Sequence, residues 1–263
     1  GGGGFAVVHR ASSEPMALDF REIAPGAAHQ NMYLDAKGAV IPGASTRGPL
    51  AAGVPGELAG LWKLHRRYGR LPWRAVVEPA IKLARDGFPV GQFLHEKISQ
   101  HLEEIKAEPL MKAIYLDELE QPIKVGENLQ QTNLSKTLKA IADHGVKVFY
   151  DGEIGRRIAD AFKKAGGLIS LKDLKGYKVR HRKVVKADAM GHQFLAMPPP
   201  SSGGAVIVQA LKALDGVDLK ALGHNSAEYV HRITETMKHG FADRARVMGD
   251  PDFAKVPLQE LIS

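Results

Sequence analysis

The stretch Met16-Ala-Leu-Asp-Phe-Arg-Glu-Ile-Ala-Pro25 begins with apolar residues and ends in charged residues followed by a proline. Residues 16–20 have the composition of a short, half-buried strand. Upstream, residues 5–8 (FAVV) have the same character, and the polar residues 10–14 between the two runs favour a turn. The chain is therefore expected to open with two short strands.

Arg21 is the candidate site residue of this stretch. If Leu18 and Phe20 face a core, strand alternation places Asp19 and Arg21 on the opposite face. An arginine at a strand end is well placed to bind a carboxylate through both arms of its guanidinium group. The alternative is an ordinary ion pair with Asp19, with Glu22 or with a neighbouring strand, and the residue chemistry alone leaves both open.

Residues 55–165 carry the helical periodicity of the chain, with prolines near the expected starts and glycines at the expected ends. An interior proline costs about 3 kcal/mol, so Pro79 is expected to break or kink its helix. Thr132 is a candidate N-cap, and Ser170 with Asp173 resembles a capping box. The expected helices run from Pro55 to Gly69, from Pro72 to Gly87, through Leu94–Ile105, from Thr132 to Gly145 and through Ile154–Phe162.

The last third of the chain returns to strands and then to helices. Residues 178–186 and 193–197 predict two strands joined across Gly191, and residues 198–204 predict a loop that leads into a helix. A long final helix is expected over about 226–248. Its expected buried stripe is Val230, Ile233, Met237, Phe241 and Ala245. This order predicts an α+β fold whose sheet is assembled from both ends of the chain.

Composition excludes several classes of function. The chain has 263 residues and a formal net charge of +7, but its densest basic stretch, 178–186, has no interleaved aromatic residues. Modules that bind single-stranded nucleic acid pair charge with stacking residues, so no nucleic-acid partner is expected. No apolar run reaches the ~20 residues that span a bilayer. The chain contains no cysteine, which excludes disulfides, thiolate zinc sites and a cysteine nucleophile.

Motifs for metals, cofactors and a serine nucleophile are missing. Gly1–Gly4 precedes a strand rather than a helix, so it favours a close backbone approach over a phosphate loop. The 11 histidines have no metal-ligand spacing. Ser201 and Ser202 lie in a Pro- and Gly-rich loop without a nearby base. Asp250 and Asp252 flank a proline in what we interpret as a helix-terminating turn rather than a calcium loop. We expect neither metal nor cofactor.

Taken together, these residues resemble the large subunit of the γ-glutamyltranspeptidases, which are N-terminal-nucleophile hydrolases. The resemblance covers nearly the whole chain, and its stretches occur in the family's order. They are Gly1-Gly-Gly-Gly-Phe5, Leu18-Asp-Phe-Arg-Glu22 with Ala24-Pro25, Gly53-Val-Pro-Gly56, Pro79-Ala-Ile-Lys-Leu-Ala-Arg-Asp-Gly-Phe88, Gly166-Gly-Leu-Ile169, Met197-Pro-Pro-Pro-Ser-Ser-Gly-Gly204, Ala242-Asp-Arg244 and Gly249-Asp-Pro-Asp-Phe253. The resemblance implies a four-layer αββα sandwich, with residues 1–263 forming one domain that is incomplete without the small subunit.

The resemblance also implies a reaction and its partners. A single precursor cleaves itself, and the new N-terminal threonine of the small subunit attacks the γ-glutamyl amide of glutathione or a relative. Water or an amino acid then takes the glutamyl group from the acyl-enzyme. Arg21 matches the arginine that binds the α-carboxylate of the glutamyl group. No cofactor is implied, and the expected location is the periplasm or the cell exterior.

The sequence departs from the complete family pattern at its ends. The chain opens directly on glycines and an apolar run, without a signal peptide, and is expected to be cut from a longer precursor. The threonine-led segment is absent, so no catalytic residue is expected in this chain. None of the five threonines (Thr46, Thr132, Thr137, Thr234, Thr236) has the matching context. Two alternatives stay open: a related acylase or poly-γ-glutamate transpeptidase, and a non-catalytic binding homologue.

Overall fold

The computed structural model describes residues 2–263, of which 47% are helical and 14% are in strands. The chain divides into two compact units. The first unit comprises Gly1–Ile23, Pro55–Gly60 and Lys178–Ser263, and the second comprises Ala24–Val54 and Leu61–Tyr177. The mixed α+β class is confirmed, whereas the single domain over residues 1–263 stays a prediction.

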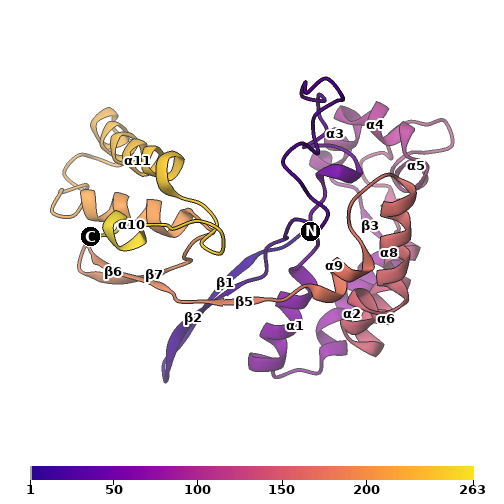
Figure 1. Cartoon of the computed structure of the whole chain (residues 1–263), viewed down its shortest axis with the longest axis horizontal. Coiled ribbons are helices and arrows are strands. Elements are labelled where there is room, and N and C mark those ends of the chain that lie inside the picture. Colours follow the sequence, from indigo (N-terminus) through magenta and orange to yellow (C-terminus); the bar gives the residue numbers. More distant parts are fainter. Residues whose placement is uncertain (1) are drawn as a thin grey trace. The chain divides into compact units, whose positions relative to one another are not determined.

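A three-stranded antiparallel sheet brings the start of the chain together with its last third. Its order is β1 (Phe5–Arg10), β2 (Ser13–Asp19) and β5 (Arg180–Arg182), with β2 in the centre (Figure 1). The two N-terminal strands are confirmed, and both are longer than predicted. Assembly of this sheet from both ends of the chain is confirmed as well.

Both faces of the end of β2 are covered. The predicted alternation of buried and exposed residues along this strand is therefore wrong at Asp19. Ala17, Leu18 and Phe20 are buried, but Asp19 is buried with them at 6% exposure. Only Arg21 of the charged pair is exposed. The reason lies in the central position of β2, and in Gly60, where a Cβ atom would overlap the ring of Phe20. Helix α1 (Glu57–Tyr68) therefore begins in direct contact with this strand end.

The single strand predicted over 178–186 is wrong, because the chain passes from one sheet to another between Arg182 and Val185. Strand β6 (Val185–Ala189) pairs with β7 (His192–Ala196) through a tight turn at Met190 and Gly191. Both turn residues have positive φ, 51° and 73°, which matches the hairpin turns that suit twisted strands. Alternate residues of β6 are buried.

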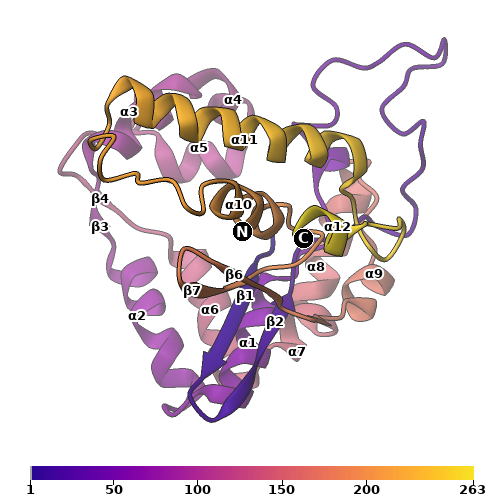
Figure 2. The same cartoon turned by 90° about the vertical axis from the view of Figure 1, so that its left-hand side faces the viewer.

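Three helices complete the first unit: α10 (Gly203–Ala213), α11 (Ala227–Val247) and α12 (Leu258–Leu261). Helix α10 lies between the β6–β7 hairpin and α11 (Figure 2). The core here consists of Val185, Ala187, Ala205, Val208 and Ile262. Helix α11 is confirmed, but its predicted buried stripe is wrong. Val230 and Phe241 are 49% and 50% exposed, whereas Gly240 is buried.

The second unit holds the predicted helical block from Leu61 onward, because Pro55–Gly60, with the first turn of α1, belongs to the first unit. Its helices besides α1 are α2 (Trp73–Asp86), α3 (Gln92–Gln100), α4 (Leu102–Ala107), α5 (Pro109–Tyr115), α6 (Thr132–His144), α7 (Lys147–Tyr150), α8 (Glu153–Lys164) and α9 (Leu171–Gly176). A 3-10 turn (η1, Pro49–Ala51) and the strand pair β3 (Phe88–Pro89) and β4 (Asn128–Leu129) join them. Among the described residues, none of the helices combines the length and apolar character needed to cross a membrane.

Several helix boundaries in this unit correct the sequence analysis. Helix α2 continues through Pro79 without a break, and it packs against α6, where Trp73 donates a 3.2 Å hydrogen bond to the Ile141 carbonyl. The helix predicted over 94–105 is divided at His101. Thr132 is the first residue of α6 rather than its cap. The capping box of Ser170 and Asp173 is confirmed.

Candidate functional site

Arg21 lies just beyond the end of β2, where the glycine-rich opening of the chain passes close by. The backbones of Gly4 and Phe20 exchange two hydrogen bonds of 3.0 and 3.2 Å. A Cβ at Gly3 would lie 2.5 Å from the backbone of Arg21. The glycines at positions 3 and 4 therefore serve a close backbone approach, as expected, whereas Gly1 lies outside the described residues.

Arg21 lines a pocket of about 550 Å³ within the first unit. The opening strand, the loop before α10 and the end of α11 supply its other walls. The lining residues are Phe5, Arg21, Pro200, Ser201, Ser202, Phe241, Arg244, Ala245, Met248 and Gly249. Two guanidinium groups, two hydroxyl groups and two aromatic rings thus face one space. This combination suits a small ligand with an anionic group and an apolar part.

The Arg21 side chain is accessible to a ligand. It is 51% exposed, and its Nε lies 3.7 Å from a carboxylate oxygen of Glu22, which is itself 40% exposed. Its guanidinium also lies 5.8 Å from the centre of the Phe5 ring. An exposed pair of this kind contributes about 1 kcal/mol or less, so Glu22 does not commit Arg21 to a structural role.

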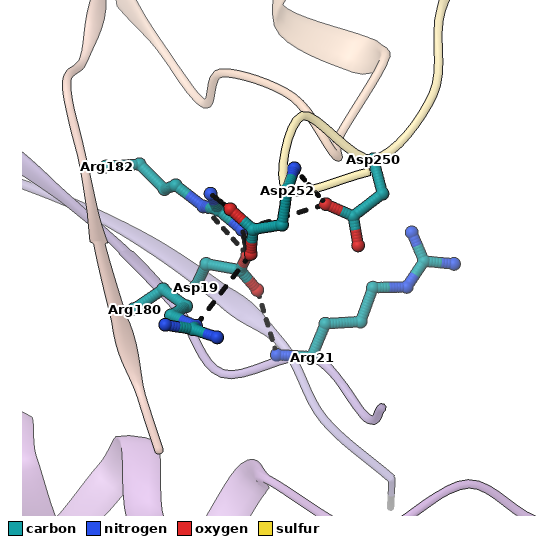
Figure 3. Close-up of polar contacts among 6 residues, drawn as sticks. All are labelled: Asp19, Arg21, Arg180, Arg182, Asp250 and Asp252. Carbon is teal, nitrogen blue, oxygen red and sulfur yellow. Dashed lines mark hydrogen bonds and ion pairs between the residues drawn. The ribbon is translucent and has the colours of Figure 1, made fainter. Parts of the chain in front are cut away.

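Asp19, the other predicted partner of Arg21, is engaged elsewhere. One carboxylate oxygen accepts the Arg21 backbone N–H at 3.1 Å, and the other accepts Nε and Nη2 of Arg182 at 3.1 and 3.0 Å. Arg182 also donates to Asp252, at 2.6 and 2.9 Å (Figure 3). These bonds raise the pKa of Arg182 and lower the pKa of Asp252. The Arg21 side chain extends away from this cluster.

Other residues singled out from the sequence lie around the same pocket. Ser201 and Ser202 precede α10, and Ser201 Oγ accepts the Gly203 N–H at 3.3 Å, which fits their expected loop role. No histidine lines the pocket among the described residues. The segment with Asp250 and Asp252 forms the turn after α11, as expected. In the part of the chain that the structure describes, no cluster of three or more His, Cys, Asp or Glu residues is arranged to hold a metal ion.

Sequence reasoning missed three residues of this region: Arg182, Arg244 and Asp252. Arg244 comes from α11, and its guanidinium lies 5.8 Å from the centre of the Phe241 ring. Arg182 was assigned only to a solvated basic stretch, yet its side chain is 14% exposed. The motif Ala242-Asp-Arg244 was recognised without an assigned role, and Gly249-Asp-Pro-Asp-Phe253 was assigned only to a turn. The partner of Asp252, Arg182, lies 70 positions away in the sequence.

Comparison with known proteins identifies the family. The sequence profile of the family described as Gamma-glutamyltranspeptidase matches residues 1–263. The chain belongs to the γ-glutamyltranspeptidase family. It is 42% identical over 262 residues to the glutathione hydrolase proenzyme of Escherichia coli K12, with 99% of this chain and 45% of the relative covered. The chain thus spans about half the length of the curated relatives that it matches.

A solved structure and a relative with another name support the same family assignment. The crystal structure of Helicobacter pylori γ-glutamyltranspeptidase superimposes with a TM-score of 0.95 at 40% identity, covering 100% of this chain and 75% of that one. The acylase ACY 1 proenzyme of Pseudomonas sp. V22 is 36% identical over 267 residues, covering 99% of this chain and 48% of that protein. The expected N-terminal-nucleophile hydrolase fold is confirmed, and this γ-glutamyltranspeptidase family member supplies part of its sheet and many flanking helices.

Proposed function

We propose that this chain is the large-subunit region of a γ-glutamyltranspeptidase that acts on glutathione or related γ-glutamyl amides. The reaction transfers the γ-glutamyl group to an enzyme hydroxyl and then to water or to the amine of an amino acid. Family membership over the whole chain and the glutathione hydrolase name of the E. coli relative support this proposal. No cofactor is required, because a hydroxyl nucleophile, a base and oxyanion donors suffice for acyl transfer.

Arg21 is the proposed anchor for the α-carboxylate of the glutamyl group. Its exposed guanidinium lines the pocket, and its ion pair with the half-exposed Glu22 is weak enough for a substrate carboxylate to compete with it. A planar guanidinium can hold a carboxylate through two parallel hydrogen bonds, each strengthened by charge. This pocket position is the observation that carries the proposal, since it supports an accessible guanidinium as the anchor for the α-carboxylate.

The proposed nucleophile is the N-terminal threonine of the small subunit made from the same precursor. The proenzyme names of the relatives support a processed, two-subunit protein. The serines at the pocket, Ser201 and Ser202, lack a base among the lining residues, so they do not replace that threonine. The heterodimer partner therefore supplies the reacting hydroxyl group, and this chain supplies the carboxylate anchor.

Turnover of γ-glutamyl-p-nitroanilide by the full-length gene product tests the proposal. Intact mass and N-terminal sequencing should find two fragments, the smaller one beginning with threonine. Arg21→Ala should raise KM by about 10- to 100-fold, the equivalent of one lost charge-assisted contact of about 1.5–3 kcal/mol. Arg157→Ala, which removes an exposed arginine of α8, is the matched control and should leave KM unchanged.

The possible outcomes separate the alternatives. An uncleaved and inactive precursor would favour the non-catalytic homologue. The match to acylase ACY 1 makes a related acylase or poly-γ-glutamate transpeptidase the second candidate. Faster turnover of glutaryl amides or polyglutamate than of γ-glutamyl-p-nitroanilide, with cleavage intact, would favour that candidate. Equal KM values for wild type and Arg21→Ala would remove Arg21 from the site.

The proposed location is the periplasm or the cell exterior, as the family resemblance implies. A chain without cysteine is compatible with an oxidising compartment, because it has no thiol to oxidise. If the activity that cleaves γ-glutamyl-p-nitroanilide is released together with a periplasmic marker enzyme during spheroplast preparation, this location is supported. Activity that stays with a cytosolic marker would contradict it.

A further inference from the structure

The carboxylate of Asp19 occupies a place where a strand partner would otherwise be. Strand β2 ends at Asp19, so the Arg21 backbone N–H lies beyond the ladder. That N–H donates instead to Oδ1 of Asp19 at 3.1 Å. The backbone of Arg21 is therefore held by the side chain of Asp19 rather than by a hydrogen bond to a neighbouring strand.

Arg182 holds this carboxylate in turn. Its Nε and Nη2 donate to Oδ2 of Asp19 at 3.1 and 3.0 Å, from the neighbouring strand β5. The two side chains are only 7% and 14% exposed. With both oxygens engaged and water largely excluded, the Asp19 carboxylate has little freedom to rotate away from Arg21.

The same guanidinium also binds the turn that follows two other pocket-lining residues. Nη1 and Nη2 of Arg182 donate to Asp252 at 2.6 and 2.9 Å. Asp252 belongs to the turn that follows Met248 and Gly249, and both of these residues line the pocket. Asp250 stabilises that turn by accepting the Asp252 N–H at 2.9 Å. One arginine thus bridges Asp19, which binds the Arg21 backbone, and Asp252, in the turn after α11 (Figure 3).

We propose that Asp19 and Arg182 are positioning residues for Arg21. Asp19 fixes the backbone from which the Arg21 guanidinium reaches the pocket, and Arg182 fixes Asp19 relative to the α11 turn. The inference rests on the proposed function, because it takes the ligand of Arg21 to be the glutamyl α-carboxylate. Lysine should not replace Arg182, because the planar guanidinium makes four hydrogen bonds to Asp19 and Asp252 in a fixed geometry, whereas an ammonium group has only three donors on a single nitrogen.

Substrate discrimination separates positioning from a general loss of folding. γ-Glutamyl-p-nitroanilide carries the α-carboxylate, and 4-aminobutyryl-p-nitroanilide lacks it but is otherwise alike. In the full-length enzyme, Asp19→Asn and Arg182→Lys should each lower the kcat/KM ratio between these substrates roughly tenfold, because a misplaced guanidinium makes longer and less linear hydrogen bonds to the carboxylate. The change should arise in KM for the glutamyl substrate, and a smaller active fraction cannot alter this ratio.

Two further variants serve as controls for this comparison. Asp173→Asn removes another carboxylate that accepts backbone N–H groups, from Gly26 and Ser170 at 2.8 and 2.9 Å, in the second unit. It should lower the melting temperature and leave the ratio unchanged. If Asp19→Asn does not fold, Asp252→Asn removes the more exposed end of the bridge and should lower the ratio in the same direction.

A double variant decides the mechanism. If Asp19 acts through Arg21, adding Asp19→Asn to Arg21→Ala should cause no further loss of discrimination, because interacting residues are non-additive. Losses that multiply, or an Asp19→Asn enzyme with normal discrimination and a lowered melting temperature, would overturn the inference. Failure of the proposed function looks different, because Arg21→Ala itself would then leave the ratio at its wild-type value.

Discussion

Gly60 determines how closely the first turn of α1 approaches Phe20. In a helix, replacing glycine by alanine usually stabilises by about 1 kcal/mol. Here the new Cβ would lie 2.0 Å from the Cγ of Phe20, which is 5% exposed. Overpacking of this kind costs about 1–3 kcal/mol, so the steric term should exceed the propensity gain.

Gly60→Ala in the full-length protein is therefore expected to reduce the free energy of unfolding by up to about 2 kcal/mol, measured by urea denaturation. Gly176→Ala is the matched control, because Gly176 is also a helical glycine, its φ is not positive and no atom lies within 4 Å of the position that its Cβ would take. That variant should be as stable as wild type or slightly more stable. A Gly60→Ala protein as stable as wild type would mean that Phe20 can move aside without cost.

Asp252 should make the stability of the first unit dependent on pH. Hydrogen bonds from Arg182, together with the charges of Arg182 and Arg180, lower its pKa below the ordinary 3.8. The unfolded chain therefore binds the proton more tightly than the folded chain does. The contribution of Asp252 is complete above about pH 4 and is lost as the pH falls through the lower, folded pKa.

The comparison of wild type with Asp252→Asn at about pH 6 and about pH 3 measures this dependence. The variant should be less stable than wild type at the higher pH, and the difference should shrink at the lower pH. Asp160→Asn, which changes an exposed aspartate of α8, should show no such convergence. A stability difference that stays constant across this range would exclude an ionised Asp252 as the source.

At the scale of elements, Ser226 supports the start of α11. Its hydroxyl oxygen accepts the Tyr229 N–H at 3.1 Å, and its O–H donates to the Leu222 carbonyl at 2.6 Å. Losing an N-cap costs about 1 kcal/mol, so Ser226→Ala should lower the unfolding free energy by about that amount. Ser226→Thr keeps the hydroxyl group and both hydrogen bonds, so it should retain most of the stabilisation that the cap provides. A Ser226→Ala protein as stable as wild type would show that the cap contributes nothing.

Local patterns predicted the existence of most elements, because periodicity, glycine stops and the capping box at Ser170 act within a few residues. The errors involve contacts made elsewhere. Helix α2 tolerates Pro79 while packed against α6, and the strand predicted over 178–186 is divided between two sheets. Helix α11 has an apolar stripe by periodicity, but periodicity does not determine whether another element of this chain covers it.

At the scale of the whole chain, the sequence identified the family and the candidate anchor Arg21, but not the residues around that anchor. Asp19 and Arg182 are 163 positions apart, and Arg182 and Asp252 are 70 apart. No local spacing rule connects them. A basic run predicts a solvated face on average, whereas the pairing of β5 with β2 and the turn with Asp252 place two carboxylates against this particular arginine, which is 14% exposed.

Electrostatics of the whole chain should also affect substrate binding. The net charge is +7, and segments far apart in the sequence place Arg21 and Arg244 at one pocket. Both guanidinium groups can attract an anionic substrate, and salt screens such partly exposed charges. Raising NaCl from about 0.05 M to about 0.5 M is expected to increase KM for γ-glutamyl-p-nitroanilide several-fold. KM for 4-aminobutyryl-p-nitroanilide, which has no carboxylate, should change little or fall.

Arg244→Gln tests which charges cause this salt dependence. In the described part of the chain, the Arg244 guanidinium lies over the Phe241 ring and forms no ion pair, so its removal should not leave a carboxylate unpaired. The variant is expected to raise KM for the glutamyl substrate at low salt and to flatten its dependence on NaCl. If wild type and Arg244→Gln show the same salt dependence, the attraction comes from the net charge of the chain and not from the pocket. If both substrates respond equally to salt, the α-carboxylate does not bind at these arginines.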